Sequence, residues 1–176
     1  FWESMIYVYP RAGYYSWPAN LGATLGVDFL PLYIAPLGTT LVAALIQLSP
    51  LVALLLLNFD VPLSRLQRAM AAFSLIAATT SGQGVAWLNT LSSQMHLAIL
   101  AGVVLVARAR QGSDAESWTL VWIVFLAGLS GAYAVFLLPV FLISAYWGGD
   151  RWRARQACVL AIAAAVQLTA HLYVRY

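Results

Sequence analysis

Residues 117–149 read SWTLVWIVFLAGLSGAYAVFLLPVFLISAYWGG and contain no charged side chain. As one straight helix this stretch would extend about 50 Å, whereas the hydrocarbon core of a bilayer is about 30 Å thick. Its centre is Gly128-Leu129-Ser130-Gly131, and glycine and serine suit the backbone angles of a tight turn. We therefore predict two short helices, near 118–129 and 132–147, that form a hairpin and return to the same side of a membrane.

The positions of the arginines favour the hairpin over a single helix. Seven of the nine arginines stand in three short breaks between long charge-free stretches. Short loops rich in arginine stay on the cytoplasmic side of a membrane. With the hairpin all three breaks lie on that side, whereas a single helix would move the third break to the opposite side. These arginines are Arg65 and Arg68, Arg108 and Arg110, and Arg151, Arg153 and Arg155.

The composition indicates a membrane protein. The chain is 62% hydrophobic and 9% charged, far from the balance of a soluble domain. The sequence therefore predicts an all-α fold, a polytopic transmembrane helical bundle with short or broken helices and an outer interfacial loop. The chain contains no lysine, which is typical of a GC-rich bacterial genome. We expect a multi-pass protein of the bacterial inner (cytoplasmic) membrane.

The net charge of +3 does not indicate a nucleic-acid partner, because the basic residues are spread over several loops rather than gathered on one face. Membrane topology and attraction to anionic lipid headgroups explain this charge, so membrane lipids are the expected partners. The single cysteine, Cys158, excludes an internal disulfide and a thiol pair for metal or redox chemistry.

We expect two regions in the chain. Residues 1–28 hold seven aromatic side chains, and tryptophan and tyrosine favour the headgroup layer. This region is predicted to be an outer-side interfacial loop with a short surface helix from Tyr14 to Leu25. Residues 29–176 are predicted to form a transmembrane helical domain of about six spans, one of them a glycine-broken hairpin. The spans are predicted near 30–57, 66–80, 88–107, 118–129, 132–147 and 156–174.

Prolines mark the first predicted span. Asp28 is expected to cap it and Pro31 suits its first turn. Pro36 and Pro50 are expected to bend it, because each removes a backbone hydrogen bond. The chain begins at Phe1 without an initiator methionine or the features of a signal peptide, and we interpret it as a fragment of a longer membrane protein.

The predicted topology gathers polar residues on the outer side, in loop 1–28, in the patch 81–96 and at the hairpin tip. Short and broken helices at membrane depth are tolerated where they line an enclosed or watery cavity. We therefore predict an outward-facing cavity roofed by loop 1–28. The alternative is that these are ordinary polar loops and close helix contacts. The candidate substrate-binding residues are Arg11, Asn89, Gln94 and His96.

The residues alone name no catalytic residue. The sequence contains no Walker loop, dinucleotide fingerprint, GxSxG or HExxH motif. No metal site and no cofactor are expected from this chain, because His96 has only His171 as a companion, without a cluster of cysteines or carboxylates. Gln47 and Gln167 fall within spans and are predicted to form hydrogen bonds between helices.

Three groups of residues together resemble a known family. They are Pro10-Arg11-Ala12-Gly13-Tyr14-Tyr15, the stretch NTLSSQMHLA at 89–98, which is similar to the pattern N-x-x-N-x-Q-W-x-L-A, and Ala127–Gly131 with Leu138-Pro139-Val140-Phe141 downstream. In these stretches the chain resembles a poorly characterised bacterial family of multispanning membrane proteins. That family is similar in turn to the GT-C class of glycosyltransferases. Ser92 and Met95 depart from the pattern, which has asparagine and tryptophan at those positions.

The resemblance implies a transferase that uses a polyprenyl-phosphate sugar at the outer membrane face. It implies a catalytic carboxylate in a first outer loop, upstream of Phe1, and an arginine or a divalent metal beside the leaving phosphate. Arg11 is the phosphate-binding candidate in this chain. The alternatives are a transporter or flippase-like carrier and a non-catalytic membrane scaffold. A carrier is expected to contain inverted repeats and ionisable residues at the midplane. The sequence shows neither, which does not separate a transferase from a scaffold.

Overall fold

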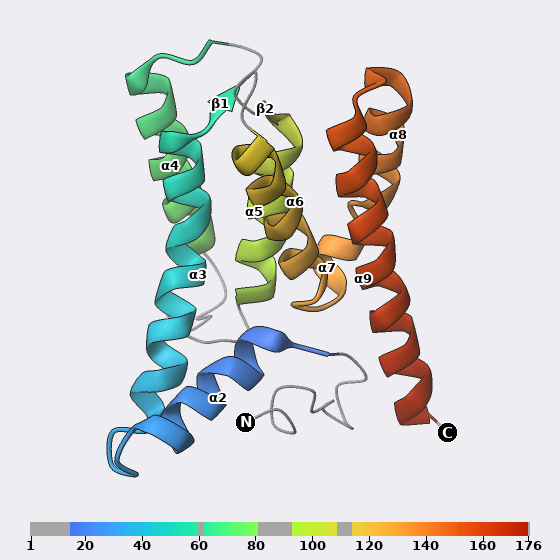
Figure 1. The fold of residues 1–176 in the computed structure, drawn as a ribbon. Coiled ribbons are helices and arrows are strands. Elements are labelled where there is room, and N and C mark those ends of the chain that lie inside the picture. Colours follow the sequence, from blue (N-terminus) through green and yellow to red (C-terminus); the bar gives the residue numbers. More distant parts are fainter. Residues whose placement is uncertain (1–14, 60–61, 81–92, 109–113, 176) are drawn as a thin grey trace.

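The computed structural model describes residues 15–59, 62–80, 93–108 and 114–175, and most of these residues lie in helices (Figure 1). The predicted all-α class is therefore confirmed. Within the described ranges the exception is an antiparallel pair of two-residue strands. The helices are α2 (Trp17–Phe29), α3 (Pro36–Leu56), α4 (Arg65–Thr80), α5 (Ser93–Val106), α6 (Asp114–Gly128), α7 (Ala132–Val135), α8 (Leu138–Gly148) and α9 (Arg151–Arg175), and the strands are β1 (Asn58–Phe59) and β2 (Ala107–Arg108).

Two of the described helices are long and apolar enough to cross a membrane, by length and composition. They are α3 and, over Arg151–Tyr173, α9. Helix α6 and the segment Ala132–Gly148 pass the same test together as one bent pair, which raises the number to three. Helix α5 is apolar but shorter, with 14 residues.

The chain after Ser117 breaks where its sequence predicts a break. Helix α6 ends at Gly128, α7 begins at Ala132, and the two arms are bent by 120°. Gly131 has φ 147°, a backbone conformation that is essentially restricted to glycine. In Figure 1, α6 runs toward the middle of the bundle and α8 runs back to the end where α6 began. The predicted break and the return of the chain are confirmed, and one straight helix is excluded. The second predicted helix, over 132–147, is divided into α7 and α8.

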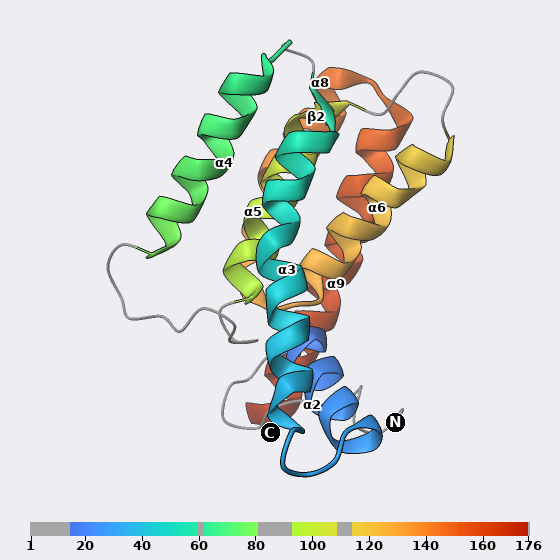
Figure 2. The ribbon, with the colours of Figure 1, turned by 90° about the vertical axis from the view of Figure 1, so that its left-hand side faces the viewer.

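The starts of α4 and α9 and the end of β2, which carry arginines, lie at one end of the bundle. The start of α4, the end of β2 and the start of α9 lie at the upper end in Figures 1 and 2, and α2 lies at the lower end. The last helix was predicted over 156–174, but it begins earlier, at Arg151. Its three arginines therefore lie on the helix rather than in a loop.

Two of these arginines cap helices other than their own. Arg68 donates a hydrogen bond to the carbonyl of Leu57 (2.8 Å) at the end of α3. Arg153 donates to the carbonyls of Val104 (3.2 Å) and Ala107 (2.8 Å) at the end of α5. The last carbonyls of a helix have no partner within it and carry partial negative charge. Each guanidinium therefore satisfies a helix end and complements its dipole.

The first long helix begins later than predicted. Helix α2 extends through Phe29, so Asp28 lies in its last turn and does not cap the following helix. Helix α3 begins at Pro36, because proline lacks the N–H that has no partner in a first turn anyway. Pro36 therefore starts the helix instead of bending it, which corrects the prediction. Pro50 does lie inside α3.

Helices α2 and α3 touch backbone to backbone. A side chain on Gly38 would meet the nitrogen of Gly26 at 2.5 Å and the carbonyl oxygen of Gly22 at 2.8 Å. A side chain on Gly26 would meet the carbonyl of Ala35. Small residues permit such close approach of two helices. These glycines hold α2 across the lower end of the bundle, where the site described below is found.

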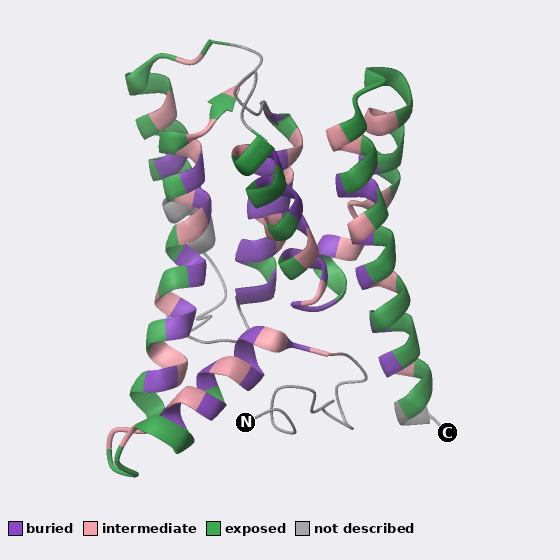
Figure 3. Cartoon of the chain, in the orientation of Figure 1, coloured by how far each residue is buried: buried purple, intermediate pink, exposed green. Residues whose placement is uncertain are grey.

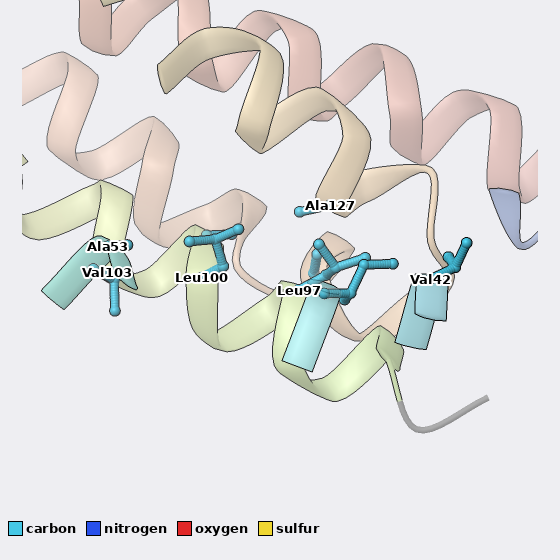
Figure 4. Packing of buried hydrophobic residues seen from close by; sticks show 9 residues of the cluster. Val42, Ala53, Leu97, Leu100, Val103 and Ala127 are labelled. Carbon is cyan, nitrogen blue, oxygen red and sulfur yellow. The ribbon is translucent and has the colours of Figure 1, made fainter. Parts of the chain in front are cut away.

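Apolar side chains fill the space between α3, α5 and α6. Val42, Leu97 and Ala127 belong to this buried cluster (Figure 4). The outward faces of the helices expose large apolar side chains instead (Figure 3), such as Leu45, which is 73% exposed, and Trp147, which is 80% exposed. Large contiguous apolar surfaces are rare on monomeric soluble proteins. This surface is suited to lipid.

The glycine contact predicts how α2 responds to substitution. Gly38→Ala adds a methyl group where the α2 backbone lies, so we expect a loss of about 2 kcal/mol in stability, the usual cost of overpacking. The measurement is the melting temperature of the purified protein. Gly102→Ala is the matched control, because nothing lies within 4 Å of that position and alanine favours a helix. Equal melting temperatures for the two variants would contradict the proposed contact.

Candidate functional site

Six polar side chains lie buried along α2, on the first turn of α5, at the hairpin tip and on α9. We call them the polar layer. Each is more than nine-tenths buried, and they come from four different parts of the chain. Buried polar groups are costly unless they have hydrogen-bond partners, so such a group needs either a structural or a functional explanation. The polar layer consists of Ser16, Asn20, Thr24, Gln94, Ser130 and Gln167.

The hairpin tip explains part of the polar layer, because the end of α6 leaves carbonyl groups without helical partners. The indole Nε1 of Trp17 donates to the carbonyl of Leu126 at 2.6 Å. The backbone N–H of Trp17 approaches the carbonyl of Leu129 at 3.5 Å. The hydroxyl of Ser130 donates to the carbonyl of Ala127 at 2.6 Å. The start of α2 and the tip itself thus cap α6.

Gln167 joins three separate parts of the chain. Its amide Nε2 donates to the carbonyls of Tyr15 (3.0 Å) and Gly128 (3.2 Å), and its Oε1 accepts the backbone N–H of Tyr15 (3.0 Å). The prediction that Gln167 forms hydrogen bonds between helices is confirmed. Through this side chain, α9 holds both the segment before α2 and the last turn of α6.

Gln94 lies against the hairpin tip. Its amide occupies the place that a side chain on Gly131 would take. The φ of 147° at Gly131 already favours glycine, and the packing of Gln94 leaves no room for anything larger. The first turn of α5 and the hairpin tip are therefore in direct contact.

The predicted site residues fall into two groups. Gln94 and His96 are both buried, at 5% and 6% exposure, on the first turn of α5. Arg11 and Asn89 lie outside the described residues, as does most of the patch 81–96. Of the four candidates, Gln94 is thus brought to the hairpin tip.

The polar face of α2 was not predicted from the sequence. Ser16, Asn20 and Thr24 follow one another at intervals of four residues, which places them on one side of a helix. This spacing is a signal that could have identified them. The aromatic residues of Tyr14–Leu25 indicate a helix on the membrane surface, and that prediction did not include a buried polar face.

Two hydroxyl groups of this face have no hydrogen-bond partner in the described part of the chain. They are Ser16 Oγ and Thr24 Oγ1, on side chains that are 0% and 3% exposed. Ser16 stands at the N-cap position of α2, yet its side chain makes no capping hydrogen bond. Their desolvation is therefore not offset by any bond among the described residues.

The described residues offer no acid or metal centre. No group of three or more His, Cys, Asp or Glu side chains gathers among them, so they do not fit the divalent metal that the family resemblance implies. None of their carboxylates is buried. Burial raises the pKa of the Tyr15 phenol from its ordinary value of 10.0, so this group beside the polar layer stays neutral at physiological pH. The chemistry available in the polar layer is neutral hydrogen bonding.

Comparisons with protein-family models, curated proteins and solved structures find no match to this chain.

The hydrogen bonds of Gln167 predict a large effect of its replacement. Gln167→Met preserves the approximate volume of the side chain but removes its hydrogen bonds to the backbone of Tyr15 and to the carbonyl of Gly128. We expect a loss of about 2–3 kcal/mol in stability, measured as a lower melting temperature. Thr169→Val is the control, because its hydroxyl is exposed and bonds within its own helix to Ala165. A Gln167→Met protein as stable as the control would contradict this role.

Proposed function

We propose that the chain crosses the membrane several times, with the arginine-bearing end in the cytoplasm and α2 on the outer side. The positive-inside rule supports this orientation, because short arginine-rich segments remain cytoplasmic. Arg65, Arg68 and the three arginines of α9 share one end of the bundle with the end of β2. The polar layer, at the opposite end, then faces the outer compartment.

Labelling of single cysteines tests this orientation. In a Cys158→Ala background, Pro62→Cys and Gly148→Cys should react with a membrane-impermeant maleimide only after the membrane is opened. Leu32→Cys, in the exposed turn between α2 and α3, should react in intact cells. All three positions are exposed. Reaction of Leu32→Cys and Gly148→Cys from the same side would contradict the orientation.

We further propose that the protein is a GT-C-like glycosyltransferase, in which the polar layer binds the polar head of a polyprenyl-phosphate sugar. The observation that carries this proposal is a pair of buried hydroxyls, of Ser16 and Thr24, that have no hydrogen-bond partner among the described residues. Sugar hydroxyls and phosphate oxygens are the donors and acceptors that such groups bind. The buried amides of Asn20 and Gln94 add further neutral hydrogen-bonding groups to the polar layer.

The proposed reaction assigns a binding role to the polar layer. An acceptor hydroxyl attacks the anomeric carbon, the bond from that carbon to the phosphate oxygen breaks, and polyprenyl phosphate leaves. The acceptor proton must pass to a base, and carboxylates are common bases for this step. The polar layer contains no carboxylate. Its part is therefore to orient the donor, which lowers the entropic cost of reaching the reactive geometry.

A flippase-like carrier and a non-catalytic scaffold are the competing functions. A carrier binds the same glycolipid but releases it intact, whereas a transferase releases polyprenyl phosphate without its sugar. A scaffold binds neither with a defined site. The products formed from a radiolabelled polyprenyl-phosphate mannose therefore separate the transferase from the carrier.

Removal of the two hydroxyls tests the site. Ser16→Ala and Thr24→Val delete hydroxyls that have no hydrogen-bond partner in the described ranges, so we expect an unchanged or higher melting temperature. We expect cross-linking of a photoreactive polyprenyl-phosphate mannose to require about fivefold more probe for each hydroxyl removed, the equivalent of one hydrogen bond. The measurement pairs a melting curve with mass-spectrometric quantification of the cross-link on the membrane-embedded protein.

Thr169→Val is the matched control, since it removes a hydroxyl of the same kind from an exposed position on α9. Its cross-linking should equal that of the unaltered protein. Unchanged cross-linking in Ser16→Ala and Thr24→Val, or a loss of stability in either, would assign these hydroxyls a structural role and remove the support for a sugar-binding site.

A further inference from the structure

At the opposite end of the bundle, Arg155 lies between two tryptophan rings. Its guanidinium carbon is 4.3 Å from the ring centroid of Trp152 and 5.0 Å from that of Trp118. The two rings meet edge to face, with centroids 5.5 Å apart. The ring faces are electron-rich and attract the cation, so α6 and α9 together hold this guanidinium in a fixed place at the surface.

The three arginines of α9 have different tasks. Arg153 turns inward and donates to the carbonyls of Val104 and Ala107. Arg151 and Arg155 are exposed. They stand four positions apart, which places them on one face of the helix. Within the described part of the chain, neither of these two forms an ion pair or a hydrogen bond. Their positive charges are therefore presented outward.

The acidic groups nearby lie at the N-terminal ends of α6 and α9. Asp150 accepts the backbone N–H of Trp152 at 3.0 Å and so caps α9. Asp114 and Glu116 lie in the first turn of α6, where carboxylates complement the positive end of that helix. The N-terminal end of α9 adds partial positive charge to that of the two arginines.

We propose that Arg151, Arg155 and the two tryptophans form a binding site for the phosphate of an anionic phospholipid in the cytoplasmic leaflet. Three features favour a lipid as the occupant. The charge is complementary to a phosphodiester, tryptophan rings belong at the headgroup level, and the end of α8 beside this site exposes Tyr146 and Trp147 at 85% and 80%. The site rests on the proposed membrane orientation and is independent of sugar transfer.

Lipid retention in native mass spectrometry tests this site. The purified protein is titrated with phosphatidylglycerol and, separately, with phosphatidylcholine of the same chain length. We expect preferential retention of phosphatidylglycerol, and we expect Arg151→Gln and Arg155→Gln each to weaken it about fivefold, as for one arginine beside an anionic headgroup. Arg155→Lys keeps the charge but stacks less well, so its retention should lie between that of the unaltered protein and that of Arg155→Gln.

Arg65→Gln is the matched control, because Arg65 is also exposed at this end of the bundle but stands on α4 with no ring contact among the described residues. It should leave retention unchanged. Equal losses in Arg65→Gln and Arg155→Gln, or equal retention of the two lipids, would overturn a defined site in favour of general surface charge. Displacement of the lipid by millimolar glycerol 3-phosphate would overturn a lipid as the occupant and identify a site for a soluble phosphate.

Discussion

The end of α6 imposes the constraint on which the arrangement of this protein depends. A helix that stops inside a bundle exposes carbonyl groups that water cannot reach, and each unsatisfied group costs several kcal/mol in a lipid-like environment. The chain meets this cost with groups from two distant segments and from the tip itself. Trp17 from the start of α2, Ser130 from the tip and Gln167 from α9 supply the donors. Helix α6 can therefore end inside the bundle because Trp17 and Gln167 donate hydrogen bonds to its last carbonyls.

The same rule operates at the other end of the bundle with charged donors. Arg68 satisfies the end of α3, and Arg153 satisfies the end of α5. Guanidinium groups suit this end because they remain charged and can reach toward headgroups and water. Neutral amides and hydroxyls suit the buried tip. The two ends thus use different residue types for one purpose. Neutral polar groups lie at the end that α2 crosses, and positive charge lies at the end where α9 begins.

The sequence predicts the hairpin well, because glycine and serine at 128–131 interrupt a stretch too long for one span. It also predicts that Gln167 bonds between helices. It does not predict which carbonyls Gln167 and Arg153 contact, because these residues lie far apart in the chain. Gln167 is 39 positions from Gly128, and Arg153 is 46 positions from Ala107. Pro36 is ambiguous for a local reason, since proline both bends a helix and begins one. The polar face of α2 is visible in its spacing, but only its burial shows that it faces protein.

The double anchorage of α9 has a consequence for the synthesis of this protein. Gln167 completes α6 near one end of the bundle and Arg153 completes α5 at the other, yet α9 follows both helices in the chain. Until Arg153 and Gln167 have been synthesised, the last carbonyl groups of α5 and α6 lack these donors. A chain that stops before Arg151 cannot complete either helix end, so the packing of α5 and α6 depends on the helix that is made last.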